Sequence, residues 1–230
     1  MIGARSILAG TLTMFAVTLF ASRQKPPLLL EWVDAGAGFQ VMKHEVPIAM
    51  WQQCVSEGGC SFMPKPGLGA SDDTYPVTGI GALDAQDFVV WARKRTGQNV
   101  RLPTLEEWYD FSEVPPFRPA QIFTDPRLTW AATYGSEGTV DPTLKRPGGF
   151  GQNSKSIADV KGNVWEWTSS CVMNEDPAHC PAFFAAGTPE AKIAVFVRDP
   201  SSGGCATGTP PAHVGVRLVY DVKSRSAVAE

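Results

Sequence analysis

The stretch Gly162-Asn-Val-Trp-Glu-Trp167 constrains what this chain can fold into more than any other part of the sequence. Trp165 and Trp167 directly flank Glu166, and large aromatic rings favour burial. A carboxylate held between two buried rings needs a partner, because a buried charge without one is costly. We therefore expect either a ligand site or a buried polar cluster at Glu166.

The residues just before this carboxylate favour a tight turn that leads into an extended segment. Gly162 and Asn163 accept a positive φ, and the residues after them have strand preferences. Asp159, Glu166 and carbonyls exposed by the turn offer the oxygen ligands that a hard cation such as calcium takes. Alternatively, Glu166 accepts hydrogen bonds from backbone donors beneath the two Trp rings. The residues alone leave both interpretations open.

Several blocks of the sequence resemble the formylglycine-generating-enzyme family, also called the sulfatase-modifying-factor family. Gly162–Trp167 resembles its G-N-V-x-E-W signature, Arg101–Trp108 its R-L-P-T-E-x-E-W block, His44–Trp51 its E-V-T-x-x-x-Y/W block, and Gly215–Val219 its closing G-F-R-L-V strand. Asn153 and Asp159 match the ends of the N-x-x-G-L-x-D run, with Ser156 in place of the glycine. These blocks follow the family's order over residues 38–221.

The resemblance implies an α+β fold, an irregular and loop-rich variant of the C-type lectin fold, formed by residues 24–230 as one domain. The 22 Gly and 19 Pro of the chain are consistent with such a loop-rich fold. The motif match also implies a structural calcium site. Its ligands would be the side chains of Asp159 and Glu166 and the backbone carbonyls of Gly162 and Val164.

The catalytic features of the family are incomplete in this sequence. In formylglycine-generating enzymes, a region opening with R-G-G-S-W carries two cysteines that bind copper; here Arg198 is present, but the loop is shortened and only Cys205 remains. One thiolate cannot form that copper site. Cys205 and His213 are candidates for a divergent copper or redox site, and a free or buried thiol is the alternative. The family's iron-dependent branch uses a histidine-rich triad, which the widely spaced His44, His179 and His213 do not favour.

The amino-terminal residues 1–23 are expected to be a targeting segment. Residues 7–21 are apolar and follow Arg5, with about the length of a signal-peptide core and short of the roughly 17–25 residues of a membrane span. A small-x-small cleavage site is missing before Ala21, so residues 6–22 could instead form an uncleaved helical membrane anchor. Both alternatives place the remaining domain outside the cytoplasm.

Cysteine spacing also points to an oxidising compartment such as the periplasm. Cys54 and Cys60 form a C-x5-C pair, and Cys171 and Cys180 form a C-x8-C pair, so each can close a short disulfide loop. The net charge of -3 provides no basic surface, which argues against nucleic acid as a partner.

Local patterns predict a first hairpin from strands at 28–33 and 39–42, and helices over 47–58 and 84–96. Pro47 suits the first position of its helix, and Gly97 suits the end of the second. Thr104 and Glu107 have the spacing of a capping box at the start of a third helix.

The function that these observations favour is that of an exported, non-catalytic accessory protein that helps to mature, assemble or recruit a partner protein. The family members that this chain resembles, which are short, exported and without the copper cysteines, include accessory proteins of copper nitrite reductase, and this suggests a role in denitrification. The first alternative is a copper- or iron-dependent oxidase of a cysteine or a peptide-derived metabolite, as in pyoverdine maturation. The second is a lectin-like ligand binder.

Overall fold

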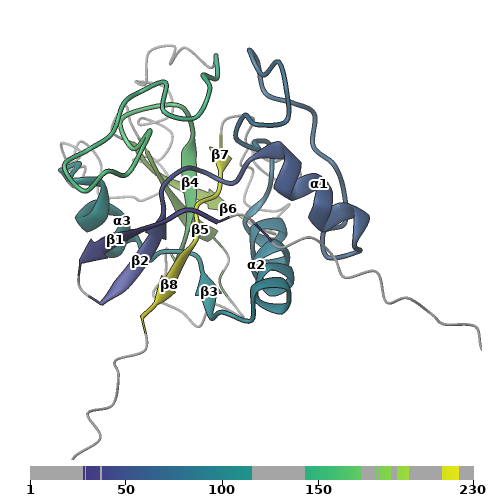
Figure 1. Ribbon diagram of the computed structural model, residues 1–230, viewed down its shortest axis with the longest axis horizontal. Coiled ribbons are helices and arrows are strands. Elements are labelled where there is room, and N and C mark those ends of the chain that lie inside the picture. The colour runs from purple at the N-terminus through teal and green to yellow at the C-terminus, as the bar shows by residue number, and fades with distance from the viewer. Residues whose placement is uncertain are drawn as a thin grey trace, which may run out of the picture.

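The computed structural model describes residues 28, 30–36, 38–115, 143–171, 180, 182–187, 191–196 and 214–222, with only the backbone described at 191–196. Within these ranges the chain forms two four-stranded sheets and three helices (Figure 1). The expected α+β fold is confirmed. Arg198, Cys205, His179, His213 and the segment 1–23 lie outside the described residues. No helix in the described part is long and apolar enough to cross a membrane.

The first sheet joins the two ends of the described chain. Its strand order is β1 (Trp32–Gly36), β2 (Phe39–Met42), β8 (Val219–Asp221) and β3 (Val100–Arg101), and every pairing is antiparallel. The predicted hairpin is confirmed, although its first strand begins at Trp32 rather than Leu28. The carboxyl-terminal strand β8 thus lies between two strands from the first half of the sequence.

The second sheet is centred on the strand that follows the Gly162-Asn163 turn. Its order is β6 (Ala191–Phe196), β5 (Ala182–Gly187), β4 (Trp165–Cys171) and β7 (Val214–Gly215), with β4 and β7 parallel. The expected extended segment is confirmed as β4. The expectation of one closing strand over 215–219 is wrong, because residues 216–218 leave β7 and cross to β8 in the other sheet.

The three helices begin and end close to the predicted positions. Helix α1 spans Ile48–Ser56 with Pro47 as its N-cap, one position before the expected one. Helix α2 spans Ala82–Thr96 and ends at Gly97, whose φ of 68° is left-handed. Helix α3 spans Leu105–Ser112, and its predicted capping box is present, with the Thr104 hydroxyl accepting from the Glu107 amide at 3.1 Å.

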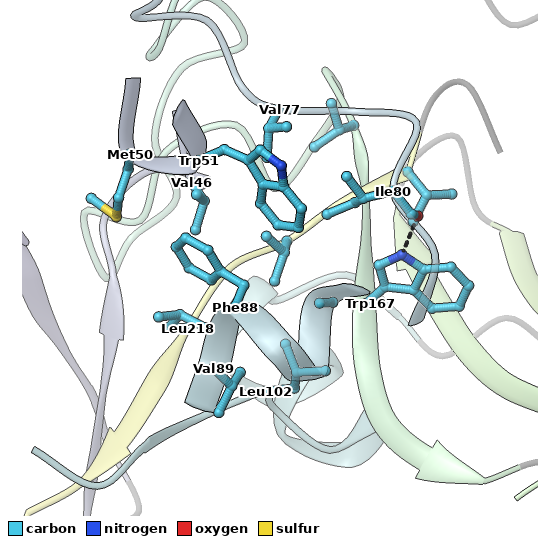
Figure 2. Close-up of a cluster of buried hydrophobic side chains, with 14 of the residues drawn as sticks. Val46, Met50, Trp51, Val77, Ile80, Phe88, Val89, Leu102, Trp167 and Leu218 are labelled. Carbon is cyan, nitrogen blue, oxygen red and sulfur yellow. Dashed lines mark hydrogen bonds between the residues drawn. The ribbon is translucent and has the colours of Figure 1, made fainter. Parts of the chain in front are cut away.

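The main hydrophobic core lies where α1 and α2 pack against the sheets (Figure 2). Trp51 of α1 stacks on Phe88 of α2 with ring centroids 5.3 Å apart. Trp167 of β4 reaches the same core, and its indole donates to the Ile80 carbonyl at 2.9 Å. A second cluster forms around Trp108 and Phe111 of α3, on the other side of the molecule from α1 and α2 (Figure 1). Strand β4 is therefore held between helical layers.

Both predicted disulfides are present, joining Cys54 to Cys60 and Cys171 to Cys180. The first closes the end of α1, and the second connects the end of β4 to the residues just before β5. Because the sequence contains five cysteines, this pairing leaves one, Cys205, outside the two loops.

We predict that the full chain, produced in an oxidising compartment and alkylated without reduction, carries one label, at Cys205. Peptide mass spectrometry should recover Cys54 linked to Cys60 and Cys171 linked to Cys180, because both pairs are already closed in the fold. Finding all five thiols alkylated would contradict both the pairing and the oxidising compartment.

Candidate functional site

Arg217 lies in the segment that crosses from β7 to β8, and its guanidinium is completely buried. Its Nε and Nη2 donate to Glu166 Oε1 at 2.9 and 2.8 Å. Nη1 donates to the carbonyls of Met42 and Lys43 at 2.9 and 2.7 Å, and Nη2 also donates to the Ala158 carbonyl at 2.9 Å. The guanidinium thus joins the end of β2, the turn before β4, and β4 itself.

Glu166 therefore has side-chain partners that its sequence neighbours do not reveal. Its Oε1 accepts both bonds from Arg217, and its Oε2 accepts from the indole of Trp108 at 2.8 Å. The alternative of backbone donors beneath the flanking Trp rings does not describe these contacts. Burial lowers the pKa of Arg217, but the nearby carboxylates, Glu166 first, outweigh it and raise that pKa above its ordinary value.

Asp159 lies in the turn before β4 with a left-handed φ of 64°. Its carboxylate accepts from the amides of Gly148 and Phe150 at 2.5 and 2.9 Å, and His44 Nδ1 lies 3.8 Å from Oδ2. Burial raises the pKa of Asp159, but His44 and the two amides outweigh that effect and leave the pKa below its ordinary value. Asp159 is therefore ionised at neutral pH.

The other two predicted calcium ligands follow Asp159 closely along the chain. The Gly162 amide donates to the Asp159 carbonyl at 3.1 Å, and the Phe150 ring packs so closely on Gly162 that a Cβ there would lie 2.3 Å from it. Val164 is buried immediately before β4. Of the two residues expected to accept a positive φ, Asn163 adopts one, at 71°, and Gly162 does not. The turn therefore needs glycine at 162 for a steric reason, the close approach of the Phe150 ring.

Glu45 is a buried carboxylate that the sequence interpretation did not single out, although the His44–Trp51 block contained it. Its Oε1 accepts from Asn163 Nδ2 at 3.4 Å, and its Oε2 has no hydrogen-bond partner among the described residues. The closest basic group, Arg217 Nη2, lies 3.8 Å from Oε2. Burial raises the pKa of Glu45 to about 8, against the lowering effect of Arg217.

These contacts define one buried polar group, the Arg217 cluster, formed by Glu45, Asp159, Glu166 and Arg217. It contains three carboxylates and one guanidinium, so negative charge is in excess when all are ionised. In the described part of the chain, no three His, Cys, Asp or Glu side chains are grouped to hold a metal. A calcium ion here would need backbone oxygens as well, which its preference for carbonyls allows. Calcium binding by Asp159, Gly162, Val164 and Glu166 stays a prediction.

The fold and this cluster define an α+β domain whose two sheets meet at a buried arginine. The family model described as sulfatase-modifying factor enzyme 1-like domain matches residues 5–222, and the chain belongs to this family. No curated protein matches the chain.

Solved structures show the same fold at low sequence identity. PvdO from Pseudomonas aeruginosa has 14% identity and a TM-score of 0.50, with 80% of each chain covered. CarF has 17% identity and a TM-score of 0.51, with 80% of this chain and 86% of that chain covered. Treponema denticola variable protein 1 has 14% identity and a TM-score of 0.50, with 85% and 93% covered. At these identities the likeness concerns the fold alone.

We predict that Arg217→Met lowers the free energy of unfolding by about 3–5 kcal/mol, because it leaves Glu166 buried without its counter-ion. The matched control is Arg101→Met, which removes a partly exposed arginine from its ion pairs with Glu107 and Asp221 and should have a clearly smaller effect. Urea denaturation of both variants measures the difference. Equal losses would contradict a special role for the buried pair.

A pH dependence follows from Glu45. Its pKa is about 8 in the folded protein against an ordinary value of 4.5, so between these values the folded state binds more protons than the unfolded state. The contribution of Glu45 to the free energy of unfolding is therefore complete below pH 4.5 and is lost as pH rises through 8. The free energy of unfolding falls by at most about 1.4 kcal/mol per pH unit over this range.

In chelator-treated protein, Glu45→Gln should therefore flatten the decrease in stability between pH 5 and 8. Urea denaturation midpoints at several pH values measure this slope, with Glu107→Gln as the control for a partly exposed glutamate. The same slope in the wild type and Glu45→Gln would show that Glu45 does not hold the proton.

Proposed function

We propose that this protein is an exported accessory protein that uses its sulfatase-modifying-factor-like domain to bind a partner rather than to catalyse oxidation. The observation that carries this proposal is the pairing of the cysteines. Four of five form disulfides within the domain, which leaves one thiol where the family's copper site needs two. With those pairs closed, the chain cannot supply a second copper-binding thiolate.

The buried polar residues support the same proposal. The Glu166 and Asp159 carboxylates accept hydrogen bonds from Arg217, Trp108 and two backbone amides, so these contacts hold the fold together. A rigid core of this kind suits a domain whose surface loops engage a partner. The disulfides support a location in the periplasm, where residues 1–23 would be a leader or an anchor.

The partner that we propose is a periplasmic metalloenzyme such as copper nitrite reductase. This choice comes from the resemblance to short exported family members that accompany that enzyme. A direct test is binding of purified copper nitrite reductase to the immobilised full chain, measured by surface plasmon resonance, with bovine serum albumin as the control analyte. Saturable binding supports this partner, and a response no greater than that of albumin would reject it.

The rival is an oxidase in which Cys205 and His213 bind copper or iron. Elemental analysis of the full chain beside its Cys205→Ser variant separates the two functions. We expect no stoichiometric copper or iron in either protein, because one thiolate is a poor site for a soft metal. Stoichiometric copper in the wild type that is lost from the variant would establish the oxidase and overturn the accessory role.

A further inference from the structure

Strand β1 is an open edge of the first sheet. It pairs with β2 on one side, and no strand among the described residues pairs with its other side (Figure 1). In an antiparallel pair, opposite residues alternate between those that exchange two backbone hydrogen bonds and those that exchange none. The backbone groups that face the open edge therefore belong to every second residue of β1.

The register of the hairpin assigns these groups to Trp32 and Asp34. The Lys43 amide donates to the Glu31 carbonyl at 2.8 Å, so Glu31 and Lys43 form a hydrogen-bonded pair. Trp32 comes next and lies opposite Met42, whose amide donates away from β1, on the β8 side of β2. The amide and carbonyl of Trp32, and those of Asp34 two positions later, therefore point away from β2.

A β-bulge closes one end of this edge. The register shifts between Asp34 and Gly36, and the Ala35 carbonyl between them accepts from Lys155 Nζ at 3.0 Å. The same ammonium group donates to a carbonyl of α3. Bulges commonly end strand pairing at sheet edges. The open part of the edge is therefore the part before the bulge, where the amides and carbonyls of Trp32 and Asp34 can pair with an extended peptide.

The side chains beside these backbone groups determine what such a peptide must carry. Trp32 and Asp34 lie on the same face of the sheet, because successive side chains of a strand alternate between faces. The half-buried Trp32 ring packs edge-on against Tyr220, with ring centroids 4.7 Å apart. Glu31 pairs with Lys43 at 2.7 Å, whereas the exposed Asp34 has no ion pair among the described residues. The edge therefore presents one uncompensated negative charge beside an aromatic ring.

We propose that β1 is the docking edge for the partner protein, which adds an extended segment to the first sheet as a further strand. This proposal rests on the accessory function proposed above and names a surface that performs it. The segment carries a basic residue opposite Asp34 and an apolar residue two positions away, against Trp32, because such cross-strand pairs stabilise a sheet. A second copy of β1 fits less well, since its only charged residue is again Asp34.

Hydrogen exchange of the full chain, followed by NMR, tests whether this edge is open. The Val33 amide, which is bonded to β2, should exchange at least about tenfold more slowly than the amides of Trp32 and Asp34 at every protein concentration. Equal protection in dilute protein would show that another segment of the chain covers the edge. Protection that grows with concentration would show that a second copy covers it. Either result would overturn the proposal.

A synthetic peptide then tests the chemistry of the edge. The probe is acetylated and amidated and repeats the sequence Lys-Thr-Val-Thr twice, so that basic and apolar side chains alternate on one face of a strand. A control peptide has Glu in place of each Lys. The lysine peptide should protect the amides of Trp32 and Asp34 and bind about two- to fivefold more tightly than the control, as expected for one exposed charge pair.

Two matched variants connect this preference to one carboxylate. Asp34→Asn keeps the side-chain oxygen that accepts from the Gly36 amide at 2.9 Å, so the hairpin is retained while the charge is removed. It should bind the two peptides equally. Asp87→Asn removes an exposed aspartate from α2, on the other side of the molecule, and should keep the wild-type preference (Figure 1). No protection by the lysine peptide, or an unchanged preference in Asp34→Asn, would overturn the proposal.

The docking edge and the accessory function can fail separately. Peptide protection without binding of copper nitrite reductase would reject that partner and support the edge. Asp34→Pro removes one outward amide from β1, a change that an edge strand tolerates, and should weaken binding of the reductase. Reductase binding that is unchanged in this variant would overturn the docking edge and leave the accessory function in place.

Discussion

A guanidinium without access to water must place its N–H groups on acceptors inside the protein, and in this fold Arg217 does so with acceptors from three separate segments. Removing a guanidinium from water costs free energy, and this cost is offset only when its N–H groups all find well-placed acceptors. The segments that supply the acceptors, the end of β2, the turn before β4, and β4, must therefore all be in place together. The two sheets share this requirement, so Arg217 helps to fix their relative position together with the hydrophobic core between them.

This arrangement assigns the residues of the family signature to the fold rather than to chemistry. The family signature around Glu166 is explained by contacts within the core, to Arg217 and Trp108. A match to that signature therefore establishes the fold and says little about chemistry. The resemblance leads us to expect the copper-binding cysteines in the segment after β6, where this sequence keeps one cysteine. The non-catalytic function that we propose is therefore compatible with membership of the family.

Local features of the fold could be predicted from the sequence because they depend on neighbouring residues. The hairpin, the α3 capping box and the two short disulfide loops are all of this kind. The Arg217 cluster could not be predicted, since its contacts join residues as far apart as Met42 and Arg217. The division of the closing segment into β7 and β8 could not be predicted either, because each strand pairs with strands that are distant in the sequence. Glu45 was missed because a lone glutamate in an extended segment gives no periodic signal of burial.

The position of β8 has a consequence for how the chain reaches its native state. This strand, at residues 219–221, pairs with β2 and β3, so the first sheet cannot form until nearly the whole chain is available. Until β8 is synthesised, β2 of the early hairpin lacks its second partner strand, and helices α1 and α2 lack part of the sheet surface that they pack against. Contacts of such large sequence separation slow folding. The first sheet therefore stays incomplete until β8 is available to pair with β2 and β3. Such late closure is compatible with the export that we propose, because a chain that has not yet folded can cross a membrane.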